Sequence, residues 1–535
     1  MSIIEESHIE ENEIGDLTPE EHAELEAEMV SFAATEKDRL GLNRKQYTEY
    51  INTEFTASQR GHTTLLISGL TVAHDELNAA ALAGLGYRTK MISVPDNEAL
   101  QYGKEFGNRG QCSPTYFTVG NLVKHLVMLR DDQGMATEDI ISEFLFVTAG
   151  ACGPCRFGTY VTEYRKALRD SGFDGFRVML FQQQGGLKQA TGEKVGLEIN
   201  AKFGYAIVRA MIAGDVLNLL GYRLRPYEVV PGSTDAAMEA SKTVLKDTLE
   251  RAGNLHMAMW KCRRIMGKVK IDRSVPKPLV SVIGEFWAMT TEGEGNYNLQ
   301  RFLEQEGAEV HIQSITNWIL FMIWENKYDT EFRMELPEHD KAKKGLEDTD
   351  PTKKLWGLAI GDKLIRAVFQ SYANILGLHD HHLPNLDEIA QLAGKYYDNH
   401  VRGGEAHMEV GKLIHFVEDK VNHMTISVKP FGCMPSSGVS DGVQSLITAK
   451  WPETIFLPIE TTGDGEVNVH SRVQMMLFKA RQRAQQEFEK ALTEAGMDEE
   501  TFKARLKGSR RRSNSFWRPK HHYVGVAANL VYSMA

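Results

Sequence analysis

The feature that most constrains the fold is an alternation of short apolar runs with helical patterns, which occurs twice along the chain. In the first half, four buried-strand candidates lie at 63–70, 88–95, 143–150 and 176–183. They are short, rich in Val, Ile, Leu and Phe, and bounded by turn residues. The rhythm returns with candidates at 277–287, 310–315, 424–433 and 454–463. Strands that alternate with helices form a parallel sheet with helices on its faces.

This alternation predicts an α/β fold with two Rossmann-like parallel-sheet domains flanking a cleft, together with helical linker and tail segments. Near the C-terminus, 471–496 has the spacing of one amphipathic helix. Its predicted buried face carries Val473, Leu477, Ala480, Ala484, Phe488 and Ala491. The predicted parts are an acidic extension (1–58), a first α/β domain (59–225), a helical linker (226–275), a second α/β domain (276–465), and a C-terminal helix with a basic tail (466–535).

The formal net charge of -11 comes from the N-terminus. Residues 1–40 hold 13 acidic and 2 basic side chains, while the rest of the chain is balanced. We expect this segment to be partly disordered or loosely helical. Residues 501–535 carry eight Lys or Arg and no acid. They predict either a solvated tail or a segment that docks on an acidic partner or on the chain's own acidic end.

Several classes of protein are not expected. The chain has no apolar run long enough to cross a membrane, and its first residues lack the pattern of a signal peptide. The neutral body carries no nucleic-acid recognition motif. Five cysteines in 535 residues are too few for a disulfide framework. We therefore expect a cytoplasmic protein whose cysteines, where they fall in motifs, bind metal or do redox chemistry.

Three of the cysteines are followed by proline two residues later. They are Cys112 in "QCSP", Cys152 in "ACGPC" and Cys433 in "GCMP". Proline suits the first turn of a helix, where its missing N–H loses no bond, and helix candidates follow all three motifs. We expect each cysteine at the carboxyl end of a strand and near a helix N-terminus. Open α/β sheets bind ligands there, and the helix dipole stabilises a thiolate.

Three other interpretations compete with a shared cluster site. Cys152 and Cys155 form a C-x-x-C that suits a thioredoxin-like redox pair, although this leaves Cys112 and Cys433 unexplained. Structural zinc usually takes pairs of ligands that lie close together in the sequence, whereas Cys112 and Cys433 each stand alone. Inert buried thiols form the third alternative, and it suits Cys262 best. An iron–sulfur cluster would use the thiolates and gain from N–H donors near its sulfurs.

Five stretches together resemble the 2-hydroxyacyl-CoA dehydratase superfamily, and in particular the dehydratase-like proteins related to CoA-substrate-specific activases. They are "NRGQCSPTYFTVGNLV", "GPCRFGTYVTEYRKALRDSGFDGFRVMLFQQ", "VIGEFWAMTTEGEGNYNLQRFLEQEGAEV", "KPFGCMPSSGVSDGV" and "GDGEVNVHSRVQMMLFKAR". Members hold a [4Fe–4S] or double-cubane cluster between Rossmann-like domains. A separate ATP-hydrolysing iron–sulfur activator supplies a low-potential electron. Their reactions are reductive or radical, such as the dehydration of 2-hydroxyacyl-CoA.

The resemblance implies a [4Fe–4S] cluster bound by Cys112, Cys155 and Cys433, with Cys152 as a further candidate ligand. Three thiolates would leave one iron open to a substrate, and four would close the cluster and favour electron transfer. Five cysteines, one of them expected to be inert, are too few for a double-cubane cluster on one chain. The resemblance also implies pairing with a homologous subunit or a second copy.

Two further residues are candidates beside the cysteines. Glu285, at the predicted strand end in "VIGEF", is either a catalytic acid–base group or the acceptor of a strand-end hydrogen bond. Arg156 is either a donor to a cluster sulfur or a plain surface charge. The chain lacks GxxxxGK[ST], so ATP would be bound by another chain. The predicted function is reductive or radical chemistry on an acyl-CoA or small substrate; the alternative is a non-catalytic electron-transfer or scaffold subunit.

Overall fold

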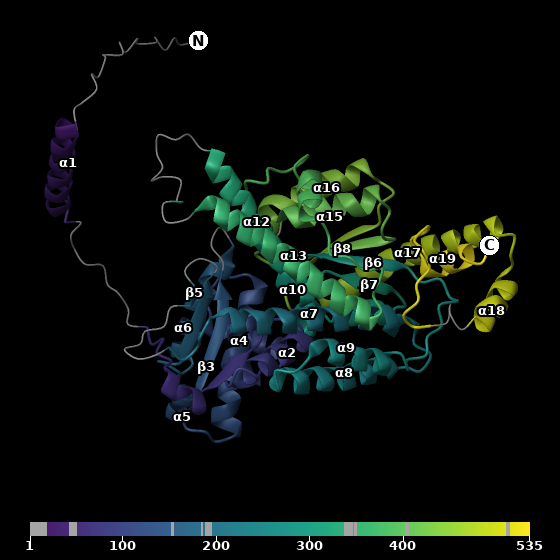
Figure 1. The fold of residues 1–535 in the computed structure, drawn as a ribbon, viewed down its shortest axis with the longest axis horizontal. Coiled ribbons are helices and arrows are strands. Elements are labelled where there is room, and N and C mark those ends of the chain that lie inside the picture. Colours follow the sequence, from purple (N-terminus) through teal and green to yellow (C-terminus); the bar gives the residue numbers. More distant parts are fainter. Residues whose placement is uncertain are drawn as a thin grey trace, which may run out of the picture. The chain divides into compact units, whose positions relative to one another are not determined.

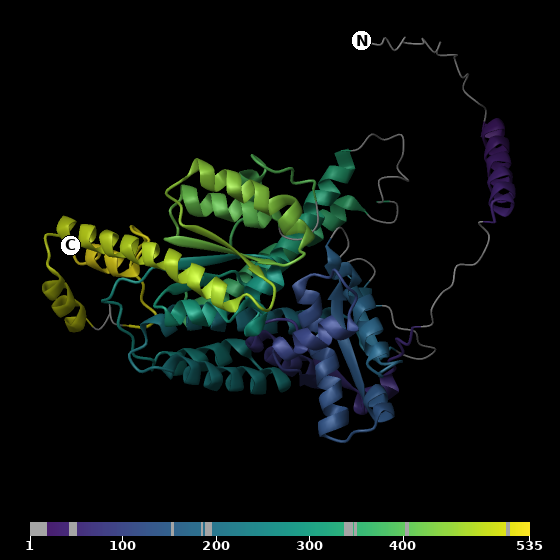
Figure 2. The same cartoon turned by 180° about the vertical axis from the view of Figure 1, so that it is seen from behind.

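The computed structural model describes residues 19–41, 51–150, 155–182, 186–187, 195–335, 346, 350–401, 406–509 and 514–535. Residues 52–535 form one compact unit (Figures 1 and 2). Helix α1 (Pro19–Arg39) belongs to a separate N-terminal unit. Its apolar residues Met29, Val30 and Phe32 are each about two-thirds exposed or more, so these three side chains are not part of a core.

The first sheet has the strand order β2-β1-β3-β4-β5, in which β1 to β4 are parallel and the short β5 runs antiparallel to β4. The strands are β1 (Thr64–Ile67), β2 (Arg88–Met91), β3 (Phe144–Gly150), β4 (Arg177–Gln182) and β5 (Gly186–Leu187). The helices of this region are α2 (Val72–Ala83), α3 (Asn97–Phe106), α4 (Ser113–Val127), α5 (Thr137–Glu143) and α6 (Tyr160–Asp170).

The second sheet has the order β7-β6-β8-β9 and is parallel throughout. Its strands are β6 (Leu279–Gly284), β7 (Glu309–Ile312), β8 (Met424–Pro430) and β9 (Phe456–Thr461). Its helices are α10 (Phe286–Thr290), α11 (Leu299–Gln305), α12 (Ile315–Glu335), α13 (Pro351–Leu376), α14 (Leu386–Ala393), α15 (Ala406–Glu418) and α16 (Asp441–Lys450). The predicted fold class, with two parallel-sheet regions and added helices, is confirmed.

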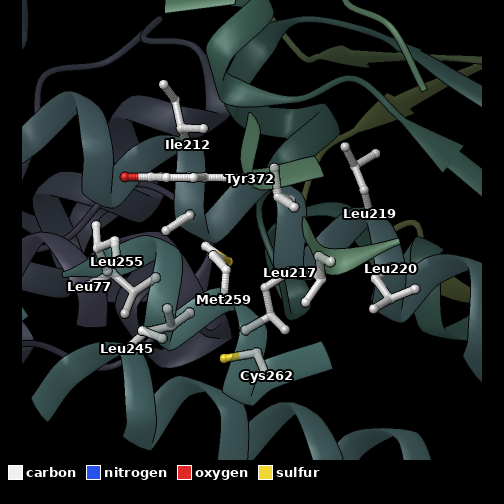
Figure 3. Packing of buried hydrophobic residues seen from close by; sticks show 14 of the residues in the cluster. Leu77, Ile212, Leu217, Leu219, Leu220, Leu245, Leu255, Met259, Cys262 and Tyr372 are labelled. Carbon is white, nitrogen blue, oxygen red and sulfur yellow. The ribbon is translucent and has the colours of Figure 1, made fainter. Parts of the chain in front are cut away.

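Three helices follow the first sheet and pack side by side in Figure 1: α7 (Ala201–Leu224), α8 (Ser233–Glu250) and α9 (Leu255–Met266). Their apolar side chains form the largest apolar core together with residues of α2 and α13, and Cys262 points into it (Figure 3). The Cys262 thiol is fully buried, and burial raises its pKa to about 12, in line with the expected inert thiol. Among the described residues, 201–227 is the one segment long and apolar enough to cross a membrane, and 56% of its apolar window is buried in the protein.

The C-terminal region is α17 (Glu466–Glu494), α18 (Glu499–Gly508) and α19 (Val526–Tyr532). All six residues of the predicted apolar face of the long helix are buried. In the described part of this basic segment Lys507 and Lys520 are exposed, as expected for a solvated tail, but other residues pack on the protein. Apolar side chains of α19 pack against α17, and the Arg518 guanidinium donates to the buried Glu309 carboxylate over 2.7 Å. Part of this segment thus belongs to the core.

Candidate functional site

Both sheets have a switch point, where the chain leaves neighbouring strands in opposite directions. The first strand of each sheet lies between the second and the third, so the switch points are β1/β3 and β6/β8. In such sheets ligands bind beyond the carboxyl ends of these strands. Glu285 directly follows β6, and Cys433 lies three residues beyond β8. Cys155 follows β3, after 151–154, which are outside the described residues and include Cys152.

Cys112 reaches the same region by a different route. It directly precedes α4, as predicted, but α3 separates it from β2, so the expectation that it follows a strand is wrong. The Ser113 amide donates to the Phe431 carbonyl over 3.1 Å, and the hydroxyls of Ser113 and Thr461 are 3.2 Å apart. Tertiary contacts therefore hold Cys112 against the carboxyl ends of β8 and β9.

The cysteine loops meet at Gly432, which has a φ of +75°. A Cβ at this position would lie 3.5 Å from the Cys112 Cα and 3.5 Å from the Arg156 Nη1. The Arg156 guanidinium also donates to the carbonyl of Gly110, just before the first cysteine. The neighbours of Cys155 and Cys433 thus contact the loop that carries Cys112, and the described structure brings all three motifs together.

Cys112 and Cys433 are both buried but lie in different electrostatic surroundings. Two hydroxyls contact the Cys112 sulfur: Thr115 Oγ1 at 3.1 Å and Tyr160 Oη at 3.2 Å. At Cys433, burial raises the pKa of the thiol, and the carboxylates of Glu285 and Glu409 raise it further. Cys433 is therefore a neutral thiol in the protein alone, and metal binding would have to release its proton.

Glu285 caps the helix that begins after β6. Its amide donates to the Val428 carbonyl over 3.0 Å, and its carboxylate accepts from the Ala288 amide over 2.8 Å. The strand-end hydrogen bond that was the alternative interpretation is therefore present. Burial raises the pKa of Glu285 to about 6, although the amides of Ala288 and Trp287 act against the shift. In addition to burial, the negative charge of the Glu285 carboxylate raises the pKa values of Tyr160 and Cys433. Glu285 therefore lies in the same region as the thiols.

Three residues of this region were not predicted from the sequence. Glu409 on α15 is buried, and its Oε2 has no hydrogen-bond partner among the described residues. Burial raises the pKa of Glu409 to about 7, partly offset by Ser440 and Lys429. Glu409 could have been found from the sequence, because it is a glutamate within the apolar run of α15. Thr115 could have been found because it lies one helical turn after Cys112. Nothing in the sequence pairs Tyr160 with a cysteine 48 positions away.

These residues fit an iron–sulfur cluster in kind and in place. Two buried thiols stand directly before helices on loops that touch, and the third lies beside a guanidinium that reaches the same loop. In the part of the chain that the structure describes, no three His, Cys, Asp or Glu side chains are gathered tightly enough for one metal ion. A four-iron cluster takes one thiolate per iron, so its ligands are spread around the cluster instead of around one ion.

Comparisons with known proteins add no neighbour to this picture. No family model matches the chain, and no curated protein matches it. The resemblance suggested by the motifs therefore stays a prediction.

Proposed function

We propose that this chain is a cytoplasmic iron–sulfur protein that holds a [4Fe–4S] cluster on Cys112, Cys155 and Cys433 and uses low-potential electrons for reductive chemistry. The observation that carries the proposal is the meeting of the three cysteine loops at Gly432. These loops lie far apart in the sequence, and an inert role for the thiols gives no reason for them to meet. Cys152 is the candidate for a fourth ligand.

When bound, such a cluster supplies a one-electron redox centre whose potential depends on the charges and hydrogen bonds around it. Arg156 and Lys429 place positive charge near the thiols. The Lys429 ammonium lies within electrostatic reach of Cys433 and forms an ion pair with Asp441. Both cations would offset the negative charge of a thiolate-bound cluster.

Two acids beside the thiols favour catalysis over simple electron transfer. Burial raises the pKa of Glu285 to about 6 and that of Glu409 to about 7. The charge of Glu285 also contributes to the raised pKa of Glu409. At neutral pH each holds a proton for part of the time, which is the property of an efficient general acid. In this proposal Glu285 donates a proton to a substrate being reduced, and an acyl-CoA or a small molecule is the substrate class.

The proposal also implies partners. An ATP-hydrolysing iron–sulfur activator would deliver the electron, because the chain itself lacks a P-loop. A homologous subunit or a second copy would complete the assembly, and neither a membrane nor a nucleic acid takes part. A purely electron-transferring or scaffold subunit is the alternative, and it needs no acids at the thiol site.

The first test is iron and sulfide analysis with EPR on anaerobically purified protein. We expect about four irons per chain, lost in Cys112→Ser and Cys433→Ser but kept in Cys262→Ala, which alters a thiol of the core. Cluster-free wild-type protein prepared under these conditions would refute the proposal. If an acyl-CoA shifts the EPR spectrum, the catalytic role gains support. Absence of any shift across acyl-CoA substrates would favour the electron-transfer subunit.

A further inference from the structure

Two hydroxyl groups converge on the sulfur of Cys112 from different helices. Thr115 Oγ1, in the first turn of α4, lies 3.1 Å from the sulfur, and Tyr160 Oη, at the start of α6, lies 3.2 Å from it. All three side chains are buried. The Tyr160 ring is also packed edge-on against Phe157 at 5.2 Å between centroids, which holds the phenol in place.

The direction of these hydrogen bonds is set by the state of the sulfur. A thiol can donate its own proton to either hydroxyl, so the three groups have several arrangements. A thiolate has no proton and only accepts, so both hydroxyls must then point their hydrogens at the sulfur. A phenol and an aliphatic hydroxyl are both protonated at neutral pH, so both groups can donate to a thiolate.

We propose that Tyr160 and Thr115 are positioning residues that donate two O–H···S hydrogen bonds to the Cys112 thiolate and thereby raise the reduction potential of the cluster. This inference rests on the proposed function. Hydrogen bonds to a ligand sulfur withdraw negative charge, which favours the reduced cluster. Bonds to an ionised acceptor are roughly twice as strong as neutral ones, so the effect of losing one is measurable.

The two helices give the arrangement a second consequence. Tyr160 opens the helix that follows Cys155, whereas Thr115 belongs to the helix that follows Cys112. The Tyr160–Cys112 contact therefore links two ligand-bearing segments directly. At Cys433 the carboxylates of Glu285 and Glu409 oppose a thiolate, while Ser436 and the Lys429 ammonium favour it. Among the described residues, hydroxyls from two separate helices contact the sulfur of Cys112.

The test is an EPR-monitored redox titration of the anaerobically purified full chain. Tyr160→Phe and Thr115→Val should each lower the midpoint potential by up to about 59 mV, which corresponds to a tenfold change in the one-electron equilibrium constant. Thr115→Ser, which keeps the hydroxyl, should restore the wild-type value. Tyr164→Phe is the matched control. Tyr164 is buried one turn further along α6 and bonds Thr118 and Thr148 instead of a cysteine, so this variant should leave the potential unchanged.

The results separate this inference from the proposed function. A wild-type protein without a cluster overturns both. If iron content and EPR intensity match the wild type while the potentials of Tyr160→Phe and Thr115→Val are unchanged, the inference alone is overturned. An equal shift in Tyr164→Phe would attribute the effect to packing and would also overturn it. If Tyr160→Phe loses the cluster, the comparison of the midpoint potentials of Thr115→Val and Thr115→Ser tests the inference instead.

Discussion

Replacing Glu285 with glutamine is expected to stabilise the protein at alkaline pH and to change little in acid. The glutamate is largely enclosed by protein, and burial is the main reason why its pKa is raised from 4.5 to about 6. A charged carboxylate at this position therefore costs folding free energy. Glutamine has nearly the same shape and keeps a carbonyl oxygen that can accept from the Ala288 amide.

The size and sign of the effect follow from this shift. A rise in the pKa of Glu285 from 4.5 to about 6 corresponds to about 2 kcal/mol between the two protonation states. Between pH 4.5 and 6 the folded protein holds a proton that the unfolded chain has released, so stability is lost as pH rises through this window. The Glu285→Gln variant should be more stable than wild type by about 2 kcal/mol at pH 8 and by less than about 1 kcal/mol at pH 5.

Urea unfolding at both pH values, followed by circular dichroism, measures this difference. Asp96→Asn is the control, because Asp96 is also a helix-capping carboxylate and accepts from the Ala99 amide over 2.9 Å. Although partial burial acts against it, Lys124 and that amide lower the pKa of Asp96, so the control should lose stability at pH 8. If Glu285→Gln is destabilised equally at both pH values, Glu285 is only a structural cap and our account of its buried charge is wrong. A stabilised but inactive variant would be typical of a functional acid kept at the expense of stability.

Three further changes test other parts of the structure. Burial lowers the pKa of His407 from 6.5 to about 4, so the stability contributed by the neutral imidazole is lost as pH falls through this window. The free energy of unfolding, measured in urea, should therefore fall between pH 8 and pH 5 by about 2 kcal/mol less in His407→Gln than in the wild type. Glu163 accepts three hydrogen bonds from the 108–111 loop, and in Glu163→Gln an amide NH₂ faces some of these donors. We expect the free energy of unfolding to fall by about 1–3 kcal/mol and iodoacetamide to alkylate the neighbouring Cys112 faster. Gly284 has a φ of +137°, and a Cβ there would overlap the backbone of Val428; Gly284→Ala should cost on the order of 3 kcal/mol or more and lower the soluble yield on expression.

Most of the fold could be predicted because local patterns and packing agree. Each of the eight predicted strand stretches contains or overlaps an observed strand of the parallel sheets. The predicted apolar face of α17 is buried at every named position, from Val473 to Ala491. In these segments the hydrophobic period reports directly on which side chains meet the core. The packing of the C-terminal segment was not predicted, because its charges dominate the composition whereas the short apolar run Val526–Val531 is what packs into the core.

The site could be predicted only in part, for a physical reason. Cysteines and a glutamate at strand ends are local features, and their placement at switch points follows from sheet topology. The position of Cys112 depends on Ser113 bonding to Phe431, more than 300 residues later, and no local pattern encodes that contact. The same holds for Tyr160 at Cys112.

The Cys-x-Pro pattern gains a physical meaning from these contacts. In α4 the proline lies in the first turn and Cys112 occupies the capping position, yet its thiol makes no capping hydrogen bond. Pro435 similarly lies in the first turn of the helix after Cys433. The first turn of α4 does not need the thiol as a cap. The Ser113 amide donates to the Phe431 carbonyl over 3.1 Å, the Thr115 amide donates to the Cys112 carbonyl over 3.0 Å, and Pro114 has no N–H to satisfy. A proline after Cys112 therefore removes an amide that would otherwise need the side chain of the capping residue as its acceptor. The Cys112 thiol can thus bind a ligand without a loss of hydrogen bonds at the helix start.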